Sequence, residues 1–74
     1  MPYIKIKCYP KDEETKKLIA SKINEIFLEH WGCPQEAISI SLEEVQPENW
    51  PDVVEKEIMP NQDKMMILSG KKEF

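Results

Sequence analysis

The feature that most constrains the fold is a change in the period of the apolar residues. Residues 3–9 alternate, with Ile4, Ile6 and Cys8 on one side, and residues 37–45 alternate again. Between them, over residues 12–31, apolar side chains recur at spacings of three and four. A period of two is typical of a half-buried strand, and a period of about 3.6 is typical of an amphipathic helix. The order strand, helix, strand predicts a βαβ unit with parallel strands.

The element boundaries carry local signals. Pro10 ends the first strand because proline has no ladder donor. Asp12 is placed to cap a helix of about 19 residues, and Gly32 is placed to end it. Beyond Pro47 the pattern is weaker. It predicts a short helix over residues 52–58 that stops at Pro60, and a tail over residues 69–74.

A chain of 74 residues predicts a single domain, residues 1–74, of the α/β (α+β) class. Two strands alone are marginal in water, and small domains are commonly held together by disulfides, a metal or a partner. Cys8, Cys33 and the single histidine, His30, fit no zinc pattern, so we expect free thiols and no metal. We therefore expect two copies to pair into a four-stranded sheet carrying helices on one face.

The other sheet face, at alternate positions from Tyr3 to Tyr9 and from Ser39 to Glu43, is polar. A polar face suits water better than burial between dimers. We therefore expect a homodimer rather than a hexamer.

The charge pattern disfavours nucleic-acid and membrane partners. The chain has 10 lysines, no arginine and 14 acids, for a net charge of −4. An acidic chain without arginine is a poor binder of phosphate backbones or anionic lipid. Residues 1–22 are nevertheless basic, which indicates either a solvated surface or an end that attracts a small anion. With no apolar run of membrane length and no signal peptide at its start, the chain is expected in the cytoplasm.

Pro2 is the residue whose chemistry stands out. If Met1 is removed, Pro2 carries a secondary amine at the chain end. An α-amino group has a reference pKa of about 7.7–8.0, and a neutral amine is a competent general base. A Met-Pro start is also common in proteins with no such function, so the dipeptide alone leaves both interpretations open.

The motifs together resemble the tautomerase superfamily, typified by 4-oxalocrotonate tautomerase and related to macrophage migration inhibitory factor. The resemblance rests on the start MPYIKIKCYP, the helix start DEETKKLIASKI, the second strand ISISLEEV and the segment QPENW. It spans about residues 2–60 and is nearest to the small bacterial subgroup with a Gln-Pro-Glu-x-Trp segment.

This resemblance implies a cofactor-free enzyme in which Pro2 shuttles a proton between an enol oxygen and a carbon of a 2-oxo acid. It also implies arginines that hold the substrate, and here Lys11 and Ser39 stand at those positions. Trp50 matches an aromatic wall of the pocket. Two other interpretations stay open at this level: Lys11 as a solvated residue at the helix start, and Trp50 as a packing residue.

The resemblance favours a tautomerase acting on a small, phenylpyruvate-like 2-oxo acid. One alternative is hydration or dehalogenation of an unsaturated acid, which normally wants arginines. Another is a homo-oligomeric scaffold or binding protein without turnover. Catalytic roles for His30, Cys8 and Cys33 are disfavoured, because a helix carboxyl end favours an imidazole cation and disfavours a thiolate, and Cys8 lies on the apolar strand face.

Overall fold

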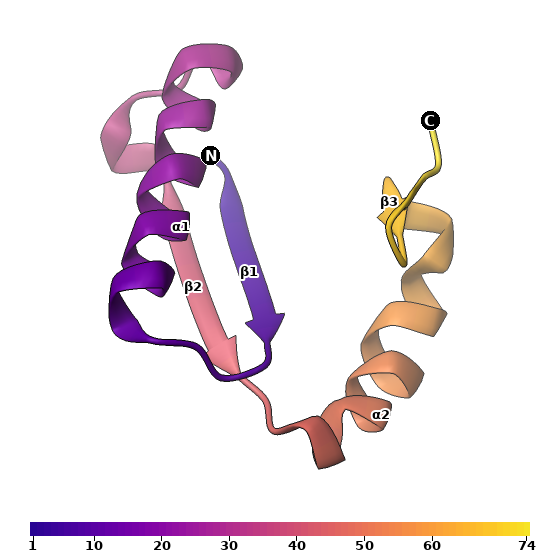
Figure 1. Cartoon of the computed structure of the whole chain (residues 1–74). Coiled ribbons are helices and arrows are strands. Elements are labelled where there is room, and N and C mark those ends of the chain that lie inside the picture. The colour runs from indigo at the N-terminus through magenta and orange to yellow at the C-terminus, as the bar shows by residue number, and fades with distance from the viewer.

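The computed structural model describes residues 1–74 and contains the predicted βαβ unit. Strands β1 (Tyr3–Cys8) and β2 (Ser39–Glu44) form a parallel pair in which Tyr3 lies opposite Ser39 and Cys8 opposite Glu44. Helix α1 (Glu13–Ile26) connects them across one face of the pair (Figure 1). The fold is therefore α+β, as expected. None of the helices is long and apolar enough to cross a membrane.

Both strands are shorter than the alternation predicts. Tyr9 lies in a bend beyond β1, and a 3-10 turn at Gln35–Ala37 delays the start of β2 to Ser39. In that turn the Ala37 N–H donates to the Pro34 carbonyl at 3.1 Å, and the Ile38 N–H to the Gln35 carbonyl at 3.2 Å. These local hydrogen bonds replace ladder bonds that a longer strand would make.

The predicted limits of the first helix are confirmed. Asp12 is the N-cap: its carboxylate accepts a hydrogen bond from the Thr15 N–H at 2.9 Å. The last turn, Phe27–Trp31, winds as a π-helix, and Gly32 ends it with a φ of 74°. Because that left-handed conformation strains a residue with a Cβ, glycine is the natural residue there.

The core of the chain is thin. The apolar side chains of both strands face α1 and are only half-buried; they are Ile4, Ile6, Cys8, Ile38, Ile40 and Leu42. Only Ala37 and Val53 are buried. Ile26 and Trp31, which belong to the apolar stripe of the helix, remain 55% and 66% exposed. Two strands are too narrow to cover that stripe.

Residues 47–72 form what we term the C-terminal arm. It comprises a 3-10 turn (Pro47–Asn49), α2 (Trp50–Val53), a π-helical turn (Val54–Ile58), a 3-10 segment (Met59–Lys64) and a hairpin of β3 (Ile67–Leu68) and β4 (Lys71–Lys72).

The expected short helix over residues 52–58 is present as α2 and the π-helical turn, which end at Ile58. Pro60 does not end helical structure altogether: it fits the first turn of the 3-10 segment, which kinks at Asn61, where φ and ψ are not helical. Residues 69–74 are also more than a tail: Ser69 and Gly70, both with positive φ, make a two-residue hairpin turn.

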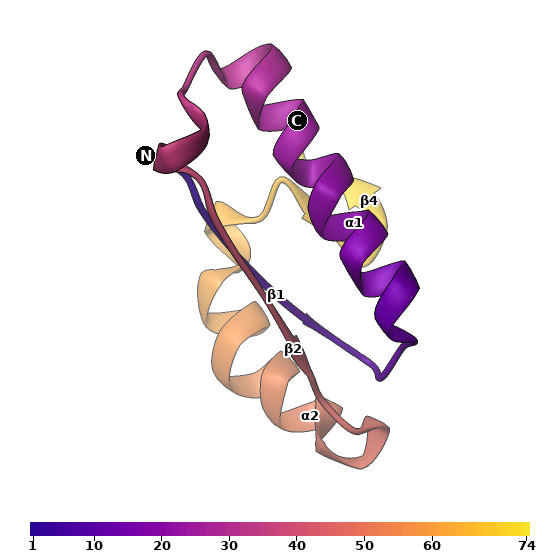
Figure 2. The same ribbon diagram turned by 90° about the vertical axis from the view of Figure 1, so that its left-hand side faces the viewer.

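The arm contacts the sheet face opposite α1. The Lys7 ammonium pairs with the Glu57 carboxylate, and the Tyr9 ring contacts the Trp50 ring edge-to-face. Figure 2 shows the strand pair edge-on, with α1 on one side and α2 on the other. From this contact the arm leads away from the strands (Figure 1). The chain exposes 6016 Å², whereas a compact monomer of its mass exposes about 4,700 Å².

Replacing Gly32 tests the helix end. No atom lies within 4 Å of a Cβ built at Gly32, so Gly32→Ala should act only through its positive φ. We expect Gly32→Ala to lower the free energy of unfolding by about 1 kcal/mol. Gly32→Asn should cost less, since asparagine tolerates the left-handed region. Urea unfolding at one fixed protein concentration measures both; equal losses would contradict the φ argument.

Candidate active site

Pro2 lies at the amino end of β1, beside β2. Its carbonyl accepts a hydrogen bond from the Ser39 N–H at 3.2 Å, and its ring is half-buried. Met1, bonded to the Pro2 nitrogen, is 97% exposed. The structure thus brings together two of the predicted site residues, Pro2 and Ser39, and leaves the residue that blocks the prolyl nitrogen in solvent.

A hollow of about 470 Å³ opens at this end of the strands. It is lined by Met1, Trp31, Gly32, Cys33, Pro34, Glu36 and Ala37. The Cys33 thiol lies in its wall and donates to the Phe27 carbonyl at 3.9 Å. Met1, which is bonded to the Pro2 nitrogen, lines this open, partly apolar space, whereas Pro2 itself does not.

Lys11 and Trp50 lie at the opposite end of the strand pair. Lys11 follows the carboxyl end of β1, and Trp50 follows the carboxyl end of β2. The six residues of β1 span about 20 Å at roughly 3.3 Å per residue. Within one chain, therefore, the structure does not bring Lys11 and Trp50 to Pro2.

Trp50 is held by an aromatic contact. The Tyr9 and Trp50 ring centroids are 5.3 Å apart, with an interplanar angle of 86°. This edge-to-face geometry is a favoured one for aromatic pairs. Trp50 also borders an apolar hollow of about 500 Å³ in the arm, lined by Val54, Ile58, Met59, Gln62, Met65, Ile67, Leu68 and Ser69. Trp50 therefore both packs the arm against β1 and presents an aromatic surface.

The segment that carries Lys11 is fixed by acidic side chains on either side. The Lys11 N–H donates to Glu44 Oε2 at 3.0 Å, and Asp12 caps α1 directly after it. The Lys11 ammonium is exposed and makes no ion pair within the chain. A fixed backbone with an unpaired cation is suited to meeting an anion.

These hydrogen bonds shift the pKa values of both acids. The Thr15 backbone and hydroxyl donors lower the pKa of Asp12 below its ordinary 3.8. The Lys11 backbone donor, and after it the Lys16 ammonium, lower the pKa of Glu44 below its ordinary 4.5. Both carboxylates thus keep their charge to a lower pH than in the unfolded chain.

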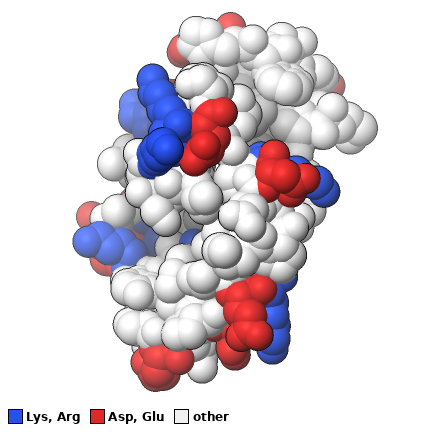
Figure 3. Space-filling view, turned by 90° about the vertical axis from the view of Figure 1, so that its right-hand side faces the viewer, with Lys and Arg blue, Asp and Glu red and all other residues white.

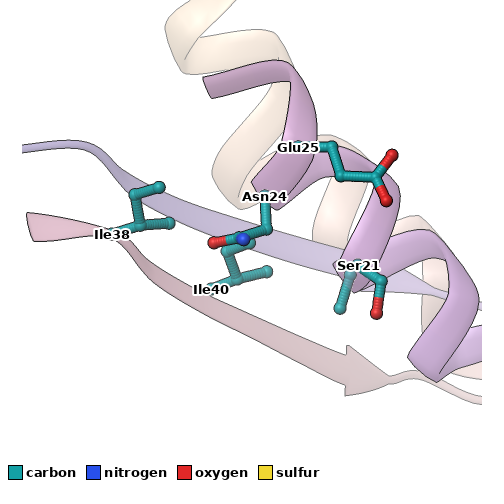
Figure 4. Close-up of a pocket in the computed structure, with 6 residues that line it drawn as sticks. Ser21, Asn24, Glu25, Ile38 and Ile40 are labelled. Atoms are coloured by element: carbon teal, nitrogen blue, oxygen red, sulfur yellow. The ribbon is translucent and has the colours of Figure 1, made fainter. Parts of the chain in front are cut away.

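A third hollow, of about 420 Å³, lies between α1 and β2 and is not a match for the predicted site. In Figure 4, Ile38 and Ile40 point from the strand toward the helix, while Glu25 points away from the strands. Asn24 is tied to Gln35 by two side-chain hydrogen bonds of 2.9 and 2.8 Å. No proposed site residue lines this hollow.

The three remaining candidates, Cys8, Cys33 and His30, do not converge on one site. Cys8 and Cys33 are free thiols, as expected, and Cys8 lies beneath α1. His30 is exposed, with its Nε2 3.7 Å from the Glu29 carboxylate. No three His, Cys, Asp or Glu side chains converge as metal ligands do.

Sequence reasoning missed Glu44 as a structural partner of Lys11. The signal was present: Glu44 continues the series Ile40, Leu42 on the strand face that packs against α1. A carboxylate on an apolar face needs a hydrogen-bond or ion-pair partner, and here the partners are Lys16 of α1 and the Lys11 N–H of the segment before it.

The geometry so far is that of a small βαβ protein with a proline, Pro2, at the amino end of its first parallel strand. The family model described as tautomerase enzyme matches residues 2–55, and the chain belongs to the tautomerase family. It is therefore an enzyme of the isomerase class.

Its relatives include proteins named Tautomerase PptA from Escherichia coli. The protein of strain O127:H6 is 37% identical over 72 residues, covering 95% of this chain and 96% of its own. Those of O157:H7 and K12/DH10B are each 35% identical over 72 residues, covering 96% and 94% of their own chains. The resemblance to the tautomerase superfamily that the sequence motifs indicated is confirmed.

Acid titration tests the two fixed carboxylates. A group with a lowered folded pKa stabilises the fold above its unfolded pKa, and that contribution is lost as the pH falls through the folded value. We expect the free energy of unfolding in urea to fall as the pH drops below the ordinary carboxyl values of 4.5 and 3.8 and through the lower folded ones, and to fall less in Asp12→Asn, which keeps a capping oxygen but does not titrate.

Asp52→Asn is the matched control, because the exposed Asp52 carboxylate accepts no hydrogen bond within the chain. Equal pH dependence in Asp12→Asn and the wild type would contradict a stabilising charge on Asp12.

Proposed function

We propose that the chain, after loss of Met1, is a cofactor-independent tautomerase of a small, phenylpyruvate-like 2-oxo acid with Pro2 as general base. The observation that carries this proposal is the position of Pro2, half-buried and hydrogen-bonded to Ser39, next to an exposed Met1 that blocks its nitrogen and lines a hollow. Membership of the tautomerase family supports it. We also treat residues 1–74 as one domain.

The reaction moves one proton and no net electrons. The neutral Pro2 amine takes the proton from the enol hydroxyl, and the oxygen lone pair becomes the new C=O bond. The C=C electrons then form a C–H bond with the proton returned by the Pro2 ammonium. The amine ends neutral. General acid–base catalysis of this kind typically contributes about 10²–10⁴-fold in rate.

A second copy would complete the site. Each chain exposes about 1,300 Å² more than a compact monomer, so two chains could together bury about 2,600 Å², within the range of stable homodimers. The arm exposes large apolar side chains, among them Met59, Met66 and Ile67, and on the face shown in Figure 3 uncharged atoms lie between scattered charged groups. Exposed apolar patches are typical of interaction sites.

The free edge of β1 is the favoured edge for pairing with the second copy. Each strand of the pair has one unpaired edge. The arm contacts β1 through Lys7, and the bend after β1 through Tyr9, so a partner along β1 would also meet the arm. An antiparallel pairing of β1 with its symmetry mate sets Pro2 of one copy near Tyr9, Lys11 and Trp50 of the other. Pairing along β2 would leave those groups separated by two further strand spacings of about 4.8 Å each.

In this arrangement each residue has a distinct task. The partner's Lys11 neutralises the substrate carboxylate as a point charge, because a lysine lacks the planar fork of arginine. The Ser39 hydroxyl donates a hydrogen bond, and the partner's Trp50 forms the wall against the phenyl group. A homodimer suffices, since the arm already covers part of the polar sheet face that a trimer of dimers would use.

Blocking the prolyl nitrogen tests the base. A chain that retains Met1 has an amide nitrogen at Pro2, which is not basic. We expect it to turn over phenylpyruvate enol at least about 10²-fold more slowly than the processed chain. Pro2→Ala, which keeps a primary amine, should fall between the two. Intact mass establishes the processing and enol absorbance the rate. Equal rates for blocked and processed chains would show that Pro2 is not the base.

Mixing two variants tests the shared site. A heterodimer of Pro2→Ala and Lys11→Ala contains one intact site if each site takes Pro2 from one chain and Lys11 from the other. Co-refolding equal amounts should then give about a quarter of wild-type kcat/KM, well above the mean of the separate variants.

A site built within one chain would show no such gain, and that result would reject the shared arrangement. Sedimentation of the same mixture should give the mass of two chains; a mass near six would reject the dimer.

A further inference from the structure

Glu44 connects three parts of the fold at the end of β2. Its Oε2 accepts the Lys11 N–H at 3.0 Å and lies 3.1 Å from the Lys16 ammonium of α1. Lys16 in turn lies 2.7 Å from Glu13 Oε1. A single carboxylate therefore joins the second strand, the first helix and the segment between the first strand and that helix.

This contact leaves the Lys11 backbone little freedom. The residue before Lys11 is Pro10, whose ring fixes its own φ, and the residue after Lys11 is Asp12, which is held as the N-cap of α1. The Glu44 hydrogen bond fixes the peptide nitrogen between these two restraints. The exposed Lys11 side chain thus extends from a restrained backbone.

The Glu44 carboxylate forms its ion pair with the Lys16 ammonium and not with the Lys11 ammonium. Lys16 is the cation paired with Glu44, and its side chain is only 19% exposed, whereas Lys11 makes no ion pair. Other charged groups border the same hollow as Glu44, namely Lys7, Glu43, Asp52, Lys56 and Glu57. Lys7 and Glu57 neutralise one another. The Lys11 ammonium is left available for an external anion.

We propose that Glu44 is a positioning residue for substrate binding: it holds the Lys11 backbone so that the Lys11 ammonium meets the substrate carboxylate. The inference rests on the proposed function only for the identity of the anion. It assigns Glu44 no contact with substrate and no part in proton transfer. The effect of removing it should therefore fall on KM and not on kcat.

Glu43 provides a matched control. It is the neighbouring acid on β2, points to the opposite sheet face and makes no hydrogen bond or ion pair within the chain. Glu43→Ala removes the same charge from the same strand. It should leave both KM and kcat unchanged.

A double-mutant cycle on the processed enzyme tests the coupling. Glu44→Ala should raise KM for phenylpyruvate enol several-fold with kcat unchanged, and Glu44→Gln, which keeps an acceptor, should raise it less. In a Lys11→Ala background, Glu44→Ala should have little further effect, because its action passes through Lys11. Equal effects in both backgrounds, or a loss confined to kcat, would overturn the inference.

The contact can be measured without turnover. In an Asp12→Asn background, which removes the adjacent titrating group, the Lys11 amide resonance should shift with pH around a midpoint below 4.5. That inflection should vanish in Asp12→Asn/Glu44→Gln. A persistent inflection would overturn the inference whatever the activity. A Lys11 amide that follows Glu44 in a chain without tautomerase activity would instead refute the proposed function and leave the contact standing.

Discussion

The parallel pairing of β1 with β2 is the constraint on which the rest of the structure depends. Because the strands run the same way, their amino ends lie together and their carboxyl ends lie together, a strand's length apart. Pro2 and Ser39 are thereby gathered at one end and Lys11 and Trp50 at the other. A two-fold related copy that pairs antiparallel along β1 would overlay opposite ends, so the topology itself favours sites shared between chains.

The thin core has the same origin. A single helix over two strands leaves Ile26 and Trp31 in solvent, and only two residues of the chain are buried. The C-terminal arm adds little cover, since it meets the strands mainly through Lys7 with Glu57 and Tyr9 with Trp50. Much of the apolar area that would stabilise this fold is therefore available only to a partner.

The absence of arginine changes how an anion can be held. A lysine offers a compact charge on a flexible stem, without the preformed fork of a guanidinium. Here Pro10, Asp12 and Glu44 restrain the backbone around Lys11, which limits the positions that the Lys11 ammonium can reach. In the proposed site, this restrained backbone would take the place of the rigidity that arginine has in its own side chain.

The local elements were determined by the sequence itself. The alternating residues of both strands, the N-cap at Asp12 and the glycine at Gly32 predicted a βαβ unit that the structure confirms, because each depends on neighbours along the chain. The motif order likewise identified the family.

The path of the arm and the contacts between distant residues were decided only by the tertiary structure. Pro60 signals a helix stop, but a 3-10 segment with a kink at Asn61 follows there, and Lys71–Lys72 pair back on Ile67–Leu68 as a hairpin. The hydrogen bond from Lys11 to Glu44 spans 33 positions, and the edge-to-face contact of Tyr9 with Trp50 joins residues that are still further apart in sequence. Contacts of this kind depend on how the strand ends, α1 and the arm pack together, which no period or local motif encodes.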